Sequence, residues 1–475
     1  MQNEHPIWRI AGRHAAEFTE LSDAVWDAPE LNFEERRALE LHAGIMTSAG
    51  FRVGTGIAGL PTAMVAEWGE GGPVIAILGE YDALPGLSQV GGKAVAEPLE
   101  SGGNGHGCGH NLLGAASALA ATAVRDWLVE AGLPGRIRYY GCPAEEGGSS
   151  KGFMVRAGVF GDVDAAICWH PAPFTGVNPA YSLACAELLF TFEGRSSHAA
   201  ATPELGRSAL DAMELMHIGV NYLREHMPRT ARVHYAVIDG GGPAPNVVQA
   251  RAVSRQLVRA TSLDELWPLV ERVSRIAEGA AMMTGTRVTA KQIAGDANLV
   301  GNLPLEEALH GILCDLKGVP FDEGDHRKAA EFLPTFTPED RAAAWNRFGL
   351  PPVANLALYD QTYPLGQADR ASVGSTDVGT VSWVVPTVQA RVATYAIGTP
   401  GHSWQLVAQG KLPAAHKGMV HAAKAMGTLA ARLIAEPDLL ARAKAAHAAF
   451  RAEHPFQNPI TAEVELPVSA QEEQA

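Results

Sequence analysis

The stretch CGHNLLGAASALAATAVRDWLVE (108–130) is followed by RIRYYGC (136–142) and then by DAAICWH (164–170). The first stretch is rich in Ala and Leu at helical spacing, which predicts a long helix. The other two are apolar runs typical of buried strands. Upstream, TAMVAEWGE (62–70) and PVIAILGE (73–80) are β-rich runs separated by glycines. Helices that alternate with apolar strands predict an α/β sheet.

A different pattern occupies the middle of the chain. Four strand-like runs there alternate with helices predicted near 206–227 and 263–284: ELLFTFEG (187–194), RVHYAVIDGGG (232–242), ARAVSRQLVRA (250–260) and RVTAKQIAG (287–295). The order β-α-β-β-α-β predicts a two-layer α+β unit inserted into the larger domain. We therefore expect the first part of the larger domain over 1–185, the inserted domain over 186–297 and the second part over 298–475.

The remaining segments carry weaker signals. Residues 12–50 are expected to be helical with a break near Pro29. After the inserted unit, 304–318 is expected to form a helix, and an acidic and polar stretch follows to about residue 350. From residue 416 the chain is rich in Ala at helical spacing, which predicts a packed helix.

Composition excludes several classes of protein. The 475 residues are 47% hydrophobic and 19% charged, which is ordinary for a globular chain of two or three domains. Lys and Arg total 37 against 52 Asp and Glu, so the net charge is −15, and no basic cluster suited to nucleic acid is present. No stretch predicts a signal peptide or a membrane span. The five cysteines form no CxxC pair, so we expect a cytoplasmic protein without a disulfide framework.

The turn Gly105-His106-Gly107-Cys108-Gly109-His110-Asn111 precedes the long helix. A thiolate and an imidazole two residues apart can converge on one divalent metal ion, and glycines let the backbone approach. The alternative is a glycine loop in which Cys108 and His110 only pack against or cap the helix. The short motif alone leaves both interpretations open.

Two neighbouring strands also end in side chains that can bind a metal. Glu145 and Glu146 follow RIRYYGC, and His170 ends DAAICWH. One of two adjacent carboxylates can bind a metal while the other takes a proton from water, although a solvated acidic loop is the alternative. Because open α/β sheets bind ligands at the carboxyl ends of their strands, we expect these groups to meet at one rim.

Two further histidines lie outside these strands. His198 follows the first strand of the inserted unit, and His402 lies in a turn that can return to the sheet and complete a metal shell. Taken singly, each fits a surface or core histidine equally well. No phosphate loop, G-x-G-x-x-G, G-x-S-x-G or zinc deaminase motif is found, which disfavours a nucleotide cofactor, a serine hydrolase and a deaminase.

Together, the motifs resemble the aminoacylase and carboxypeptidase family of metallo-amidohydrolases, most closely its aminobenzoyl-glutamate hydrolase subgroup. The resemblance is carried in order by residues 29–31, 33–35, 79–85, 105–111, 143–148, 169–171, 194–199, 244–248, 375–379 and 401–405. It implies a metallopeptidase-like catalytic domain with a central mixed sheet flanked by helices. The inserted domain would then be a lid that often forms a dimer interface.

The resemblance also implies roles for individual residues. Glu145 would be the base that activates water, and His198 would stabilise the oxyanion, within the chain or across a dimer. Asn246 and Arg259 would hold the substrate carboxylate. A divalent metal, Zn or Mn as one or two ions, would be bound by Cys108, His110, Glu146, His170 and His402.

Two positions depart from the family pattern. Two-metal members usually carry His-x-Asp where this chain has Glu80-Tyr81-Asp82, so the first ligand of that pair is absent and the number of ions is open. Many relatives have Asp where Asn111 follows the Cys-Gly-His turn. A neutral amide there can weaken metal affinity or orient a ligand differently.

The leading interpretation is an amidohydrolase that cleaves an N-acyl amino acid, with p-aminobenzoyl-glutamate as first candidate. A dipeptidase or an indoleacetyl-amino-acid hydrolase would use the same site. An auxiliary subunit of a two-chain hydrolase is the third interpretation, but every catalytic position that can be matched is filled. We expect a homodimer or a homologous partner subunit, with no nucleic acid and no membrane as partner.

Overall fold

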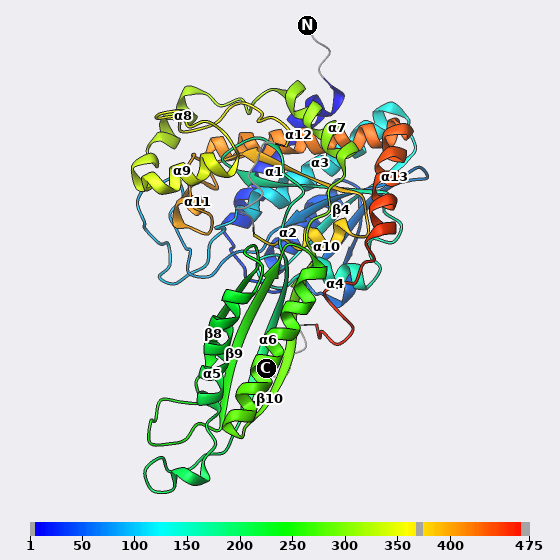
Figure 1. Ribbon diagram of the computed structural model, residues 1–475. Helices are drawn as coiled ribbons and strands as arrows, with labels where there is room; N and C mark the ends of the chain where they lie inside the picture. The colour runs from blue at the N-terminus through cyan, green and yellow to red at the C-terminus, as the bar shows by residue number, and fades with distance from the viewer. Residues whose placement is uncertain (1–4, 367–373, 467–475) are drawn as a thin grey trace.

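The protein contains two β-sheets that lie in separate bodies. The structure is a computed structural model that describes residues 5–366 and 374–466. Within these residues, one sheet has seven strands and the other has four. The four-stranded sheet and its two helices extend away from the larger body (Figure 1). The predicted fold, an α/β domain with a smaller α+β unit, is confirmed.

The seven-stranded sheet is mixed. In spatial order its strands are β1 (Arg52–Thr55), β2 (Met64–Glu70), β4 (Gly135–Cys142), β3 (Val74–Glu80), β5 (Ala165–Ala172), β11 (Thr387–Ala393) and β6 (Gly176–Val177). The pairs β3–β4, β3–β5 and β5–β11 are parallel, whereas β1–β2, β2–β4 and β6–β11 are antiparallel. Every residue of β3 is buried, as expected for a strand covered on both faces.

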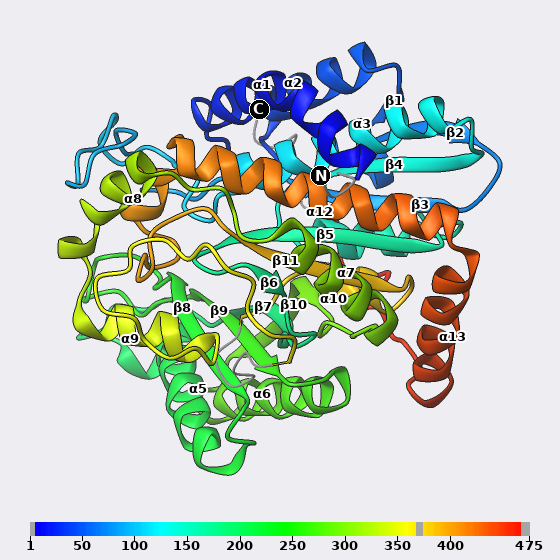
Figure 2. The same ribbon diagram turned by 90° about the horizontal axis from the view of Figure 1, so that it is seen from above.

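Long helices cover one face of this sheet. The helices α1 (Pro6–Trp26), α3 (His110–Ala131) and α12 (Pro413–Ala435) pack together and form the main hydrophobic core with the strands. Figure 2 shows α12 lying across the sheet. By length and composition α3 could cross a membrane, but 78% of its apolar window is buried. Small Ala side chains let α3 pack at the centre of the core.

Shorter helices complete the larger body. The helices α4 (Ser150–Arg156) and α10 (Val378–Ser382) lie on the other face, in a second apolar cluster. The others are α2 (Arg36–Ser48), α7 (Leu303–Leu316), α8 (Glu323–Ala330), α9 (Pro338–Arg347), α11 (Trp404–Gln409) and α13 (Pro437–Glu453).

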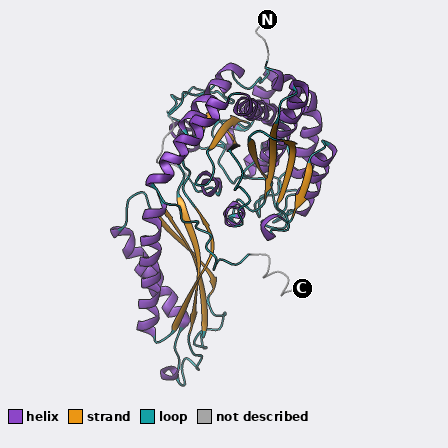
Figure 3. Ribbon diagram, turned by 90° about the vertical axis from the view of Figure 1, so that its right-hand side faces the viewer, coloured by secondary structure: helices purple, strands orange, loops and turns teal. Residues whose placement is uncertain are grey.

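The inserted unit has the predicted element order. Its antiparallel sheet runs β10 (Arg287–Asp296), β7 (Ala184–Glu193), β9 (Arg251–Ala260), β8 (Arg232–Asp239), and the helices α5 (Ala209–Leu223) and α6 (Leu263–Thr284) share its core. Figure 3 shows both helices on one face of the sheet. We use "inserted unit" for β7 through β10. The division into 1–185, 186–297 and 298–475 stays a prediction.

Three local expectations are refined by the structure. The acidic stretch before residue 350 contains α8 and α9, each of which begins with a capping box, at Asp322–Asp325 and at Thr337–Asp340. The Ala-rich tail forms two helices, α12 and α13, because Pro437 begins a new helix. No strand was predicted at β11, which the structure places inside the large sheet.

Candidate metal centre and substrate pocket

The carboxyl ends of three neighbouring strands meet at one edge of the large sheet. Asp82 follows β3, Glu145 and Glu146 follow β4, and His170 lies near the end of β5. The strands β4, β3 and β5 are adjacent and parallel, so their ends lie side by side. The helix α3 begins at His110 at the same edge.

A close backbone contact brings His402 to this edge. The carbonyl oxygen of Gly107 accepts a hydrogen bond from the His402 backbone N at 3.0 Å. A Cβ atom on Gly107 would lie 2.4 Å from the Leu87 Cδ1 and 3.4 Å from the His402 Cα. Only glycine therefore fits between the loop after β11 and the turn before α3.

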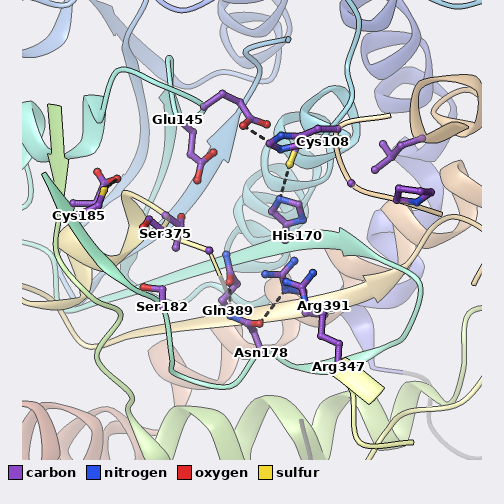
Figure 4. A pocket seen from close by; sticks show the side chains of 18 of the residues that line it. Cys108, Glu145, His170, Asn178, Ser182, Cys185, Arg347, Ser375, Gln389 and Arg391 are labelled. Atoms are coloured by element: carbon purple, nitrogen blue, oxygen red, sulfur yellow. Dashed lines mark hydrogen bonds and ion pairs between the residues drawn. The ribbon is translucent and has the colours of Figure 1, made fainter. Parts of the chain in front are cut away.

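The predicted metal ligands converge in the structure. The Cys108 Sγ lies 3.2 Å from the His170 Nε2 (Figure 4), and the His402 Nε2 lies 3.3 Å from the Glu146 Oε2. Three overlapping groups have donor atoms within 4.8 Å of one another: Cys108–His110–His170, Cys108–Glu146–His402 and Glu80–His110–Glu145. We call the residues of these groups the donor cluster.

The donor cluster fits a divalent metal ion. The buried His110 Nε2 and Glu146 Oε1 atoms have no hydrogen-bond partner in the described part of the chain. Buried polar atoms without partners are costly, and both atoms belong to the cluster. Burial and the nearby Glu146 raise the pKa of the Cys108 thiol. A mixed set of thiol, imidazole and carboxylate groups suits a transition-metal cation.

Asp82 positions two of the predicted ligands. Its Oδ1 lies 2.8 Å from the His110 Nδ1, and its Oδ2 accepts a hydrogen bond from the Glu146 backbone N at 2.8 Å. Although burial opposes it, the neighbouring His110 holds the pKa of Asp82 below its ordinary value. A carboxylate behind a ligating imidazole orients the ring and increases its basicity. This role of Asp82 was not predicted from the sequence.

Glu80 was interpreted as the absence of a ligand, but its carboxylate belongs to the donor cluster. The Glu80 Oε2 lies 3.4 Å from the His110 Nε2. Its other oxygen accepts a hydrogen bond from the Lys151 Nζ at 2.7 Å, and the same ammonium donates to the Asp377 Oδ1 at 2.6 Å. The side chains of Lys151 and Asp377 are completely buried. This ionic network was not predicted from the sequence either.

Replacing Lys151 by Met is expected to destabilise the protein by about 3–5 kcal/mol, because Glu80 and Asp377 would remain buried without their cation. Denaturant unfolding followed by circular dichroism measures the change. Lys93→Met is the control, since Lys93 pairs with Glu97 at the surface and such pairs contribute about 0–1 kcal/mol. Equal stability of the two variants would contradict a structural role for the Lys151 network.

Asn111 points away from the donor cluster. Its Nδ2 donates to the Ser22 Oγ at 3.0 Å and to the Gly410 carbonyl oxygen at 3.3 Å. The amide therefore joins α3 to α1 and to the segment after α11. These contacts give Asn111 a packing role in place of a role beside the ligands.

A cavity of about 640 Å³ opens beside the donor cluster. Its lining comes from both bodies and includes Cys108, Glu145 and His170 as well as Arg259 of β9. The Arg259 guanidinium donates to the Ser375 Oγ at 2.9 Å. The volume is typical of a small-molecule pocket. The structure thus places the predicted substrate residue Arg259 in the same cavity as the donor cluster.

The other two predicted residues lie outside this cavity. His198 and Asn246 are exposed on adjacent loops of the inserted unit, where the Ala199 backbone N donates to the Asn246 carbonyl oxygen at 3.0 Å. The His198 Nδ1 accepts hydrogen bonds from the backbone N atoms of Ala200 and Ala201. Within one chain, the structure brings His198 and Asn246 close to each other but not to the donor cluster.

This combination of a donor cluster, an adjacent carboxylate and a cavity shared with an inserted unit places the protein among the metallo-amidohydrolases. The chain belongs to peptidase family M20/M25/M40, whose family model matches residues 76–388. The resemblance inferred from the motifs is thereby confirmed.

Individual relatives agree with this assignment. The chain is 42% identical over 453 residues to a p-aminobenzoyl-glutamate hydrolase subunit of Escherichia coli (strain K12), covering 93% of this chain and 94% of the relative. It is 31% identical over 441 residues to the Xaa-Arg dipeptidase of Mus musculus, covering 88% and 86%. A dinuclear metal-binding peptidase of the M20 family from Bacillus subtilis shares the fold, with a TM-score of 0.57, 18% identity and coverage of 89% and 99%.

Proposed function

We propose that this protein hydrolyses the amide bond of an N-acyl amino acid, with p-aminobenzoyl-glutamate as the substrate. The observation that carries the proposal is the place of Glu145, whose Oε2 lies 4.0 Å from the His110 Nε2 and whose side chain lines the cavity. The similarity to the p-aminobenzoyl-glutamate hydrolase of Escherichia coli over most of the chain supports this choice of substrate.

In the proposed reaction, Glu145 is the general base. A divalent metal, Zn or Mn as one or two ions, would be held by Cys108, His110, Glu146, His170 and His402 and would supply Lewis acidity at the substrate carbonyl. Burial, with Glu80 and Glu146 nearby, raises the pKa of Glu145, which strengthens its carboxylate as a base. Glu145 takes a proton from the attacking water and donates it to the leaving amide nitrogen.

The inserted unit supplies the remaining groups of the proposal. Arg259 in the cavity would bind the substrate α-carboxylate through a charge-assisted hydrogen bond. His198 and Asn246 lie together on loops outside the cavity of their own chain. We therefore assign them to the pocket of a second subunit, where His198 would stabilise the oxyanion and Asn246 would contact the carboxylate.

An exposed edge of the inserted unit supports a dimer. β8 is an edge strand of its sheet. Large apolar side chains are exposed on β8 and on the neighbouring helix α5: Ile218, Tyr222, Tyr235, Val237 and Ile238. An unpaired strand edge beside exposed apolar side chains is a template for pairing with another chain. We propose that this edge binds a second copy of the chain, or a homologous partner subunit. A cytoplasmic location, supported by five free cysteines, completes the proposal.

The test is release of p-aminobenzoate from p-aminobenzoyl-glutamate by the purified chain. We expect release in the presence of Mn or Zn, loss of activity after chelation, and recovery when metal is added back. A chelator already saturated with metal is the control for direct inhibition. Activity that persists after complete removal of metal would contradict the proposal.

A substrate panel separates the alternatives. The pocket is also compatible with a dipeptide or an indoleacetyl amino acid, so both are assayed beside p-aminobenzoyl-glutamate. Turnover of a dipeptide alone would replace the proposed substrate but leave the chemistry of the site. Activity that requires a second, homologous chain would identify this chain as half of a two-chain enzyme.

A further inference from the structure

We propose that Arg391 and Arg347 form an anion site in the cavity that binds a second carboxylate of the substrate. The inference rests on the proposed function and deepens it, because it defines the substrate class as dicarboxylates. Both arginines line the same cavity as the donor cluster. Figure 4 shows them together beside His170, whereas Ser375, the partner of Arg259, lies on the side of Cys185.

The sheet places Arg391 next to the donor cluster. Arg391 on β11 is the register partner of His170 on the parallel strand β5. Paired residues of neighbouring strands project from the same face of a sheet, so the two side chains are neighbours. Burial and the charge of Arg391 lower the pKa of His170, which agrees with this proximity. An anion bound at Arg391 therefore lies beside the reacting centre.

A hydrogen-bond chain fixes the Arg391 guanidinium and leaves most of its donors free. Its Nε donates to the Asn178 Oδ1 at 3.0 Å, and the Asn178 Nδ2 donates to the Gln389 Oε1 at 2.7 Å. Among the described residues, its two terminal nitrogens have no hydrogen-bond or ion-pair partner. A guanidinium held through Nε presents its terminal N–H groups in the fork that binds a carboxylate.

Arg347 adds a second cation without a counter-ion. It ends α9 and forms no ion pair or hydrogen bond with any described residue. Asp340, the acidic residue of α9 that lines the cavity, is occupied in the capping box at the other end of the helix. Burial and the charge of Arg347 lower the pKa of Arg391. Two neighbouring guanidinium groups repel each other, and a bound anion removes this cost.

The other arginines of the cavity are already occupied. Arg255 forms an ion pair with both oxygens of Glu187, and Arg259 donates to Ser375. Arg347 and Arg391 are therefore separate from the residue proposed to bind the α-carboxylate. A substrate with two carboxylates, such as an N-acyl glutamate, can use Arg259 and the Arg347–Arg391 pair at the same time.

Binding of reaction products tests the anion site without relying on turnover. Calorimetry on the metal-loaded full chain compares L-glutamate with L-glutamine, which lacks the second carboxylate. We expect glutamate to bind at least about tenfold more tightly. Arg391→Met should bring the ratio close to one, and Arg347→Met should reduce it. Arg327→Met is the control, because Arg327 is an exposed residue of α8 paired only with Glu323, and it should keep the ratio.

A second pair of ligands identifies the source of the carboxylate. Succinate and butyrate represent acyl groups with and without a second acid. If Arg391→Met removes a preference for succinate over butyrate, while glutamate and glutamine bind equally, the anion site recognises the acyl group. If Arg391→Met changes neither ratio, or wild type discriminates neither pair, the inference is wrong.

Kinetics separate this inference from the proposed function. For p-aminobenzoyl-glutamate and p-aminobenzoyl-glutamine, Arg391→Met should raise KM mainly for the glutamate substrate. Failure to release p-aminobenzoate, together with a glutamate preference that depends on Arg391, would reject the proposed substrate and keep the anion site. Equal turnover of both substrates by wild type and by Arg391→Met would do the reverse.

Discussion

Replacement of Glu145 by Gln is expected to lower kcat for amide hydrolysis about 10²–10⁴-fold, the usual contribution of a general acid–base residue. The amide occupies the same volume but cannot accept the proton of the attacking water. Glu145 is not one of the proposed ligands, so metal content should stay at the wild-type level. The measurements are p-aminobenzoate release and metal content of the purified variant, since metal loss would lower activity for another reason.

Two further variants make this result specific. Glu307→Gln, an exposed change on α7, should keep wild-type activity. Glu146→Gln should lose bound metal as well as activity, because Glu146 lies 3.3 Å from His402 in the donor cluster. If Glu145→Gln retained a wild-type rate, another group would have to be the base.

The second large effect is expected at His198, although it lies outside the cavity of its own chain. His198→Ala should lower kcat about 10²–10³-fold, which is the usual effect of removing one oxyanion donor. Because the site would take His198 from the other subunit, the loss should be recovered in mixed dimers. Co-expression of His198→Ala with Glu145→Gln creates one intact site per heterodimer, with Glu145 from the first chain and His198 from the second.

The outcome of mixing decides how His198 acts. Activity of the mixed sample well above that of either variant alone would support action across the dimer. No recovery, with dimers demonstrated by light scattering, would contradict it. A wild-type rate for His198→Ala alone would remove the residue from the proposed mechanism.

The fold was predictable where the signals are local. The buried strands β3, β4 and β5 are short apolar runs, and the ligands that follow them are adjacent in sequence to strand ends. Glu145 and His170 were therefore found from the rule that strand ends meet at one edge. The capping boxes of α8 and α9 are also local signals, but their acidic composition concealed two helices.

The groups that support the site were not predictable because their partners are distant in the chain. Lys151 is separated from Asp377 by 226 residues, and Arg391 is separated from Asn178 by 213 residues. Nothing near Lys151 in sequence indicates a buried ammonium between two carboxylates. Asp82 carried a signal in its family motif, but only its contacts with His110 and Glu146 show what it does.

The position of β11 has a consequence for how the protein is made. In the large sheet, β11 lies between β5 and β6, yet its residues follow the whole inserted unit in the chain. The inserted unit is contiguous, so it can fold on the ribosome as soon as β10 emerges. The large sheet has to wait for β11, and the donor cluster has to wait for His402. Metal loading therefore belongs to the last stage of biogenesis, after a slow, non-local closure of the sheet.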